Sequence, residues 1–98
     1  VPRIAVGDTA YGRAAARRAA ADVIHAGEGQ RNHTLNQAAF GLGQLVAGGE
    51  LLRETAESML EQAGLQAGLT EREVNKTISS GLQAGAKEPR NAPARAAA

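Results

Sequence analysis

The sequence predicts an all-α protein, a small bundle of four main helices with a disordered C-terminal tail. Apolar residues recur at three- and four-residue spacing in separate stretches of the chain, which is the period of helices that bury one face. Glycine or proline interrupts the chain between these stretches. The 98 residues suffice for one core but not for two. We therefore expect one domain with short connections and mostly antiparallel neighbouring helices.

The composition excludes several kinds of protein. The chain has no cysteine, so neither disulfides nor thiolate–zinc sites can stabilise it. Aromatic residues make up only 2% of the chain, which predicts a core of small side chains between closely approaching helices. No stretch approaches the roughly 20 apolar residues of a membrane span, and no signal peptide is visible. Because the chain also does not begin with Met, we expect a cytoplasmic piece of a larger protein, without a membrane partner.

The chain divides into three parts by composition. Residues 1–8 are a lead-in, residues 9–87 form the helix-bundle domain, and residues 88–98 form a flexible tail or linker. The last part contains Pro89 and Pro93 and has no periodic apolar pattern, which is typical of disordered segments.

The first helix is expected to begin at a cap, Asp8 or Thr9, and to run to about His25. His25 would then lie near the helix C-terminus, where a partial positive charge is favourable. A broad apolar stripe should face the core. Its members are Tyr11, Ala15, Ala16, Ala19, Ala20, Val23 and Ile24.

Basic residues are unevenly distributed, although the formal net charge is only +1. Arg13 and Arg17 share one face of the first helix at i, i+4 spacing, and Arg18 lies beside them. Such a ridge can bind phosphate, or it can be an ordinary solvated helix face. The sequence leaves both interpretations open.

The stretch from Arg31 to Gly49 predicts the central helix, around which the others pack. Asn32 is expected to be its N-cap, and Gly48 and Gly49 can adopt the left-handed conformation that ends a helix. Backbone N–H groups at its start, with Arg31 and His33 close by, are suited to an anion, but a capped helix start explains the same residues. Its buried stripe comprises Leu35, Ala38, Ala39, Leu42, Leu45 and Val46.

The third helix is expected from about Arg53 to Gln66. Three carboxylates, Glu54, Glu57 and Glu61, lie opposite its apolar stripe. Carboxylates at this spacing can hold a metal ion, but no histidine or further ligand accompanies them. We therefore expect a solvated acidic face.

The fourth helix has the clearest start. Thr70 and Glu73 fit a capping box, in which each side chain accepts a hydrogen bond from the other residue's backbone N–H. Gly81 and Gly85 lie on its apolar face and should cost about 1 kcal/mol each in helix propensity. That cost is tolerable where another helix or a ligand approaches the backbone closely. The opposite face comprises Arg72, Asn75, Lys76, Ser79 and Gln83. Two interpretations of this face are open: it contacts phosphates, or it is an ordinary solvated face.

Nothing in the chain predicts an active site. His33 and Thr34 are a base and a hydroxyl, but adjacent residues of a helix point in different directions. His25 and His33 are therefore expected to be structural. We expect no catalytic residue and no metal ligand in this chain.

Two segments carry a resemblance to a known module. They read RNHTLNQAAFGLGQLVAGGELL, from Arg31, and AGLTEREVNKTISSGLQAGAKEPR, ending at Arg90. The chain resembles, from about Tyr11 to Arg90, the helical domain that follows the catalytic domain in bifunctional DNA primase–polymerases of actinobacterial phages, plasmids and integrated elements. In such proteins an N-terminal primase domain of the archaeo-eukaryotic type performs metal-dependent nucleotidyl transfer. The carboxylate motifs of that domain are absent here.

The resemblance implies a non-catalytic accessory domain that acts in primer synthesis during DNA replication. Its implied partners are the single-stranded DNA template, the initiating nucleoside triphosphate and the catalytic domain of the same parent chain. No cofactor is implied for the bundle itself, whereas the parent enzyme would use Mg²⁺ or Mn²⁺ with nucleoside triphosphates. The binding residues carried over by position are Arg31, Asn32, Asn36, Lys76 and Ser80, with Arg13 and Arg17 as weaker candidates.

One departure from single-strand binding proteins is clear. The chain has one Tyr and one Phe, so it lacks the aromatic platform on which bases usually stack. Binding should then be mostly electrostatic and sensitive to salt. The alternative is a structural or protein-interaction bundle that links the primase–polymerase to a helicase or another replication subunit. In that case Arg31 and Asn32 are capping and packing residues.

Overall fold

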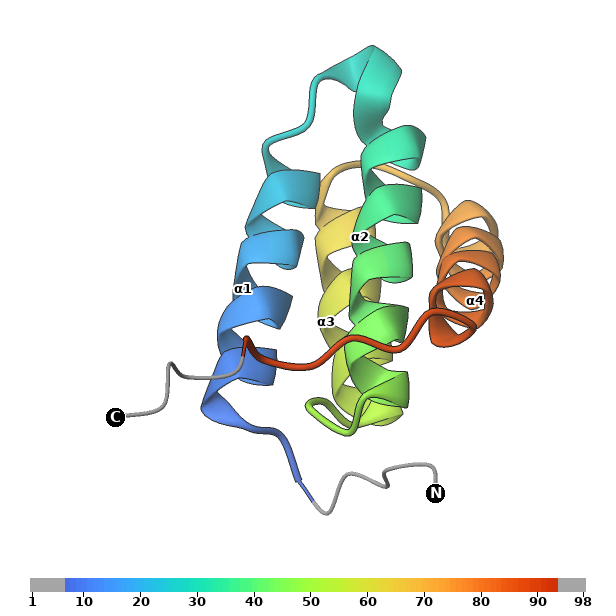
Figure 1. Ribbon diagram of the computed structural model, residues 1–98. Coiled ribbons are helices and arrows are strands. Elements are labelled where there is room, and N and C mark those ends of the chain that lie inside the picture. The colour runs from blue at the N-terminus through green and yellow to red at the C-terminus, as the bar shows by residue number, and fades with distance from the viewer. Residues whose placement is uncertain (1–6, 94–98) are drawn as a thin grey trace.

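A computed structural model describes residues 7–93, which form four α-helices and one 3₁₀ turn (Figure 1). The helices are α1 (Ala10–Ile24), α2 (Arg31–Ala47), α3 (Arg53–Gln66) and α4 (Glu71–Ala86), and the 3₁₀ turn η1 (Glu28–Gln30) precedes α2. The described residues contain no strand. The predicted all-α bundle of four helices is confirmed, and most of the predicted lead-in lies outside the described residues.

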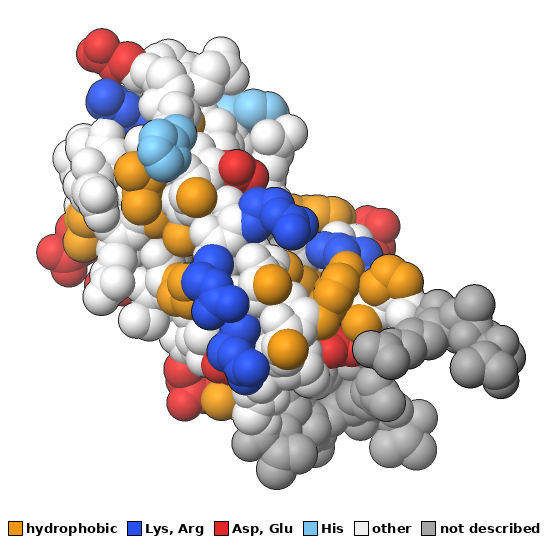
Figure 2. Space-filling model, turned by 90° about the vertical axis from the view of Figure 1, so that its left-hand side faces the viewer, with side chains coloured by type: hydrophobic (Ala, Val, Ile, Leu, Met, Phe, Trp, Pro, Cys, Tyr) orange, Lys and Arg blue, Asp and Glu red, His pale blue; other side chains and the backbone are white. Residues whose placement is uncertain are grey.

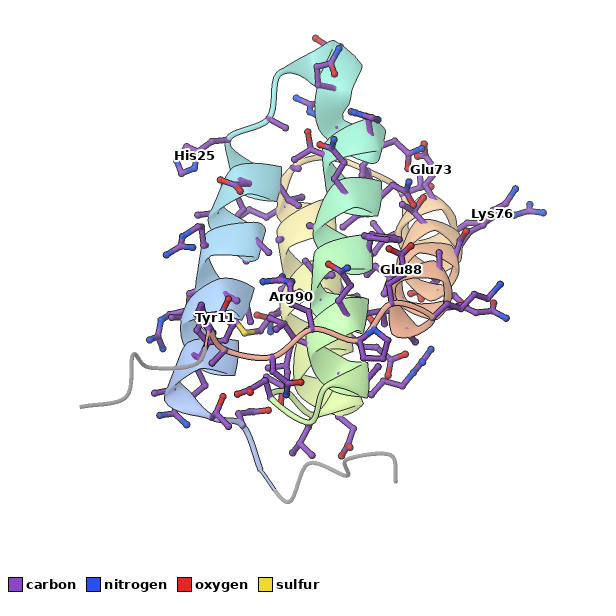
Figure 3. All side chains as sticks on the ribbon, viewed as in Figure 1. Tyr11, His25, Glu73, Lys76, Glu88 and Arg90 are labelled. Carbon is purple, nitrogen blue, oxygen red and sulfur yellow. The ribbon has the colours of Figure 1, made fainter. Side chains whose placement is uncertain are left out.

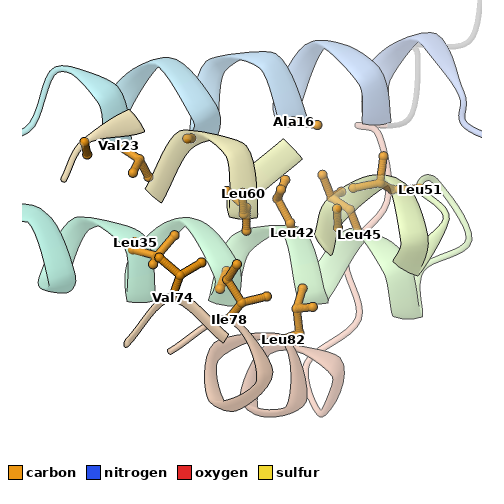
Figure 4. Packing of buried hydrophobic residues seen from close by; sticks show 14 residues of the cluster. Ala16, Val23, Leu35, Leu42, Leu45, Leu51, Leu60, Val74, Ile78 and Leu82 are labelled. Atoms are coloured by element: carbon orange, nitrogen blue, oxygen red, sulfur yellow. The ribbon is translucent and has the colours of Figure 1, made fainter. Parts of the chain in front are cut away.

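Three of the helices run alongside one another, and the fourth crosses them. In Figure 1, α1, α2 and α3 stand side by side with alternating direction, as predicted for antiparallel neighbours. By contrast, α4 is seen nearly along its axis in Figures 1 and 4, so it crosses α2 instead of running antiparallel to it. α1 and α4 lie on opposite sides of the bundle and make no contact with each other.

Glycines explain why α4 can cross so close to α2. A Cβ atom at Gly85 would overlap the carbonyl oxygen of Phe40, and one at Gly43 would overlap the carbonyl oxygen of Leu82. At Gly81 a Cβ atom would meet the side chain of Ala39. The close approach predicted at Gly81 and Gly85 is thus confirmed, and the element that approaches is α2.

The core lies between α2 and the other three helices (Figure 4). The predicted stripe of α2 supplies much of it, although Ala38 and Val46 are only partly buried. Gly43 is buried in addition, because α4 crosses the helix there. The largest fully buried side chains are Leu35, Leu42, Leu45, Leu51, Leu60, Leu82, Val23 and Val74.

The start of α2 differs from the prediction. The helix begins at Arg31, its N-cap is Gln30, and no side chain of the cap bonds to the first turn. Asn32 is therefore not the N-cap. The 3₁₀ turn, closed by a hydrogen bond from the Gln30 N–H to the Gly27 carbonyl (2.8 Å), leads directly into the helix and places Asn32 inside its first turn. There the Asn32 Oδ1 accepts a hydrogen bond from the Thr77 hydroxyl of α4 at 2.7 Å.

Asp8 and Thr9 cap two different helices. Thr9 is the N-cap of α1, where its Oγ1 accepts from the Gly12 N–H at 3.0 Å. The Asp8 carboxylate instead accepts from the Leu52 N–H (2.7 Å) and the Thr55 hydroxyl (2.8 Å) at the start of α3. A carboxylate is favourable there because it faces the positive end of the helix dipole. Only Thr9 therefore fulfils the expectation of a cap for the first helix.

The described part of the predicted flexible tail lies against the bundle. Residues 88–93, here called the strap, cross α2 towards α1 (Figures 1 and 3). The Arg90 N–H donates to the Gln44 carbonyl at 3.0 Å, and the Asn91 side chain donates to the Gly48 carbonyl. The Gln44 carbonyl accepts from the Gly48 N–H as well, so the strap uses its second lone pair. Residues 94–98 lie outside the described residues.

The capping box of α4 is confirmed and supports a prediction. Thr70 Oγ1 accepts from the Glu73 N–H at 3.2 Å, and Glu73 Oε1 accepts from the Thr70 N–H at 3.1 Å. We expect Thr70→Ala to lower the free energy of unfolding by about 1 kcal/mol, measured by urea denaturation. The matched control is Glu71→Gln, in the same turn but outside the box, which should change little. Equal effects of the two variants would contradict this role.

The same capping box makes the stability contributed by Glu73 depend on pH. Hydrogen bonds from the Thr70 backbone N–H and then its hydroxyl hold the pKa of the Glu73 carboxyl below its ordinary value. Because the folded pKa lies below the unfolded one, the stability contributed by Glu73 is present above the unfolded pKa and is lost as pH falls through the folded pKa. The stability difference between the natural chain and Glu73→Gln should therefore shrink in acid.

Candidate functional site

A polar groove of about 510 Å³ lies between α2 and α4. We call it the α2/α4 groove; its lining residues are Asn32, His33, Asn36, Glu73, Lys76, Thr77 and Ser80. Asn32 and Asn36 project from the same face of α2 because they are four residues apart. On α4, Lys76 and Ser80 share a face for the same reason.

The groove brings together four of the residues that the sequence singled out. Asn32 and Asn36 come from α2, and Lys76 and Ser80 come from α4. Lys76 lines the groove, and its side chain extends outward from α4 into solvent (Figure 3). All four are exposed, and solvent can reach them.

The three predicted arginines lie elsewhere. The Arg31 guanidinium lies against the turn between α3 and α4, where a Cβ atom at Gly68 would be 3.3 Å from its Nη1. Arg13 and Arg17 lie on α1, on the opposite side of the bundle from α4. The Arg13 Nη1 donates to the Asp8 carbonyl at 2.8 Å. The predicted binding residues therefore lie in three places: four in the α2/α4 groove, Arg31 at the α3–α4 turn, and two arginines on α1.

The α2/α4 groove offers hydrogen-bonding groups and one ammonium group. Lys76 supplies an ammonium group, and no ion pair between described residues involves it. The Asn32 Oδ1 already accepts from Thr77, so its NH₂ group keeps two donors for a ligand. The Glu73 carboxylate disfavours a second anionic group nearby. This arrangement can hold one phosphate together with neutral polar groups.

The described residues contain no cluster of metal ligands. Among residues 7–93 no group of three or more His, Asp or Glu side chains could hold a metal ion. The three carboxylates of α3 point to solvent or pair locally, since Glu57 lies 3.7 Å from Arg53. The groove's own polar groups are two amides, two hydroxyls, an imidazole, an ammonium group and a carboxylate.

Sequence reasoning missed several residues that matter. Thr77 was not among the predicted binding residues, yet it lines the groove and bonds to Asn32. Arg90 was placed in the tail, yet its side chain lies at a second groove between α1 and α2. Glu50 carried no prediction, and it is buried. The only sequence signal for Arg90 was its place at the end of the resembling segment.

The fold and the groove define a small all-α bundle with a groove lined by polar side chains. Comparisons add no relative to this description: no protein family, curated protein or solved structure matches the chain. Within the described residues, no helix has both the length and the apolar character that crossing a membrane requires.

Proposed function

We propose that this bundle is an accessory domain of a DNA primase–polymerase, which holds single-stranded template and initiating nucleotide in the α2/α4 groove. One observation carries the proposal. The residues that the resemblance singles out on two distant segments, Asn32 and Asn36 on one and Lys76 and Ser80 on the other, line the same groove.

The groove is suited to a nucleotide unit of a single strand. The Lys76 ammonium can pair with one phosphate, and Glu73 keeps a second phosphate away from the same end. The amides of Asn32 and Asn36 can bond to base edges, which are exposed in a single strand. Because the His33 imidazole is the one ring among the residues that line the groove, stacking contributes little there, and binding is weak. The nucleotidyl transfer itself belongs to the catalytic domain of the parent protein.

The test is fluorescence anisotropy with a labelled single-stranded oligonucleotide, with and without nucleoside triphosphate, over a range of salt concentrations. Each phosphate neutralised on a single strand contributes about −0.7 to the slope of log K against log salt. We expect Lys76→Ala to weaken binding and to reduce this slope by about 0.7. Asn36→Ala should weaken binding with the slope unchanged, because its amide is neutral.

The matched control is Lys87→Ala, the chain's other lysine, which lies beyond α4 and outside the groove. It should leave binding nearly unchanged. Equal loss in the two lysine variants would indicate general electrostatic attraction and would contradict the assignment to this groove. Absence of binding at low salt by folded protein would contradict template binding altogether.

A protein-interaction bundle is the second candidate function. It is favoured by the contacts of two predicted residues, since Arg31 packs over Gly68 and Asn32 bonds to Thr77. On this alternative the bundle links the primase–polymerase to a helicase or another replication subunit. Arg31→Ala would then lower the stability of the α3–α4 turn and leave the affinity for single-stranded oligonucleotide unchanged.

A further inference from the structure

A second groove, of about 310 Å³, lies between α1 and α2 on another side of the molecule. We call it the α1/α2 groove. Small or aliphatic residues make up the apolar part of its lining: Ala14, Ala15, Ala19, Ala38, Gly41 and Leu42. Small side chains on both helices leave room for the backbone of a third element to approach.

Two guanidinium groups border this groove. Arg18 comes from α1, and Arg90 comes from the strap. The Arg90 side chain donates to the Tyr11 hydroxyl (3.1 Å), to Gln44 Oε1 (3.3 Å) and to the Gly41 carbonyl (3.5 Å). Figure 3 shows Arg90 and Tyr11 close together. These acceptors are all neutral, so the guanidinium is held in place while its charge is not compensated.

Arginines predominate around the α1/α2 groove, and Asp22 is the one carboxylate of its lining. No ion pair between described residues involves Arg17, Arg18 or Arg90, and all three side chains are exposed. Figure 2 shows the basic side chains gathered on this face with apolar side chains between them. A surface of this kind, apolar in the groove and cationic at its borders, is complementary to an amphipathic segment with carboxylates beside its apolar stripe.

The lining distinguishes a helix from a nucleic acid. Tyr11 supplies the one aromatic ring of this lining, and its hydroxyl is bonded to Arg90. The alanine methyl groups that make up most of the apolar lining offer no surface on which bases can stack. They do offer the shallow surface into which the ridge of a packing helix fits. The lining runs along α1 from Tyr11 to Asp22, which at about 1.5 Å per residue is roughly 16 Å, or three turns of a docked helix.

We propose that the α1/α2 groove docks an acidic amphipathic helix of another protein. Its small apolar side chains fill the groove, and its carboxylates pair with Arg18 and Arg90. This proposal does not rest on the function proposed for the α2/α4 groove, because the two grooves share no residue.

The test is a titration of the ¹⁵N-labelled full chain with a synthetic helical peptide of about fourteen residues. The peptide carries alanine and leucine on one face and glutamate on the flanks of that face. We expect saturable shifts at the amides of Ala14, Ala15, Ala19, Ala38 and Gly41. A matched peptide with glutamine in place of glutamate should bind at least about fivefold more weakly.

Two variants separate docking from simple charge attraction. Arg18→Glu changes an exposed side chain and should weaken the acidic peptide at least about fivefold with the helicity unchanged. Ala14→Arg adds positive charge but fills the groove. Docking therefore predicts weaker binding by Ala14→Arg, whereas charge attraction predicts tighter binding.

Lys76→Ala is the control on the other groove. It should leave the peptide affinity unchanged, so failure of either proposal is distinguishable from failure of the other. The docking proposal is overturned by an absence of shifts at saturating peptide, or by tighter binding of Ala14→Arg. It is also overturned if an oligothymidine strand shifts the same amides at lower concentration than the peptide, since the face would then bind nucleic acid.

Discussion

Gly85→Ala should destabilise the bundle by about 2 kcal/mol, although alanine is the better helix former. The gain in helix propensity is about 1 kcal/mol. This gain is outweighed by the steric overlap between the new methyl group and the carbonyl oxygen of Phe40. A carbonyl of a helix backbone cannot rotate away as a side chain can, so α4 must move away from α2. That movement loosens the contacts of Ile78 and Leu82 with the core.

Chemical denaturation followed by circular dichroism measures this effect. The control is Gly41→Ala on α2, where a Cβ atom would meet only the Arg90 Nη2 at 3.9 Å. This variant should be neutral or more stable by up to about 1 kcal/mol, because only the propensity term remains. If Gly85→Ala were as stable as Gly41→Ala, the close crossing of α2 and α4 would be refuted.

Local patterns explain why much of the fold could be predicted. The bounds of α3 agree with the expected range from Arg53 to Gln66, since they follow from the apolar period alone. Thr70 and Glu73 form the expected capping box because all its atoms lie within one helical turn. The glycines at 81 and 85 indicated a close helix contact, but not which helix would make it.

Contacts between distant segments could not be predicted in this way. Asp8 caps α3 rather than its neighbour α1, across 44 residues of sequence from Leu52. The strap bonds to α2 through an irregular backbone that has no period to detect. For the candidate site, the convergence of Asn36 and Lys76 depends on how α4 crosses α2. The resemblance grouped Arg31 with them, but its side chain lies against Gly68.

Glu50 is the second position where we expect a large effect. It lies between α2 and α3, and only 7% of its surface is exposed. Its Oε1 accepts from the Thr9 hydroxyl at 2.7 Å, and its Oε2 accepts from the Asn91 side chain and the Ala92 N–H, each at 3.2 Å. The carboxylate thus joins the start of α1 to the strap.

Glu50→Ala should lower the free energy of unfolding by about 1–3 kcal/mol, because partly buried donors lose a charged acceptor. The strap should also detach. Amide hydrogen exchange at Arg90 and Ala92 should then accelerate. The fluorescence of Tyr11 should change as well, and it reports this contact alone because the chain has no other Tyr and no Trp. The control is Glu54→Ala, an exposed carboxylate on α3.

Glu50 also connects stability to binding. If the strap detaches, Arg90 no longer lies fixed at the α1/α2 groove, so Glu50→Ala should weaken the acidic peptide. The α2/α4 groove contains no strap residue, and oligonucleotide binding that depends on Lys76 should persist in the same variant. Unchanged exchange at Arg90 in Glu50→Ala would contradict this connection, because the strap would then be held by the contacts of Arg90 itself.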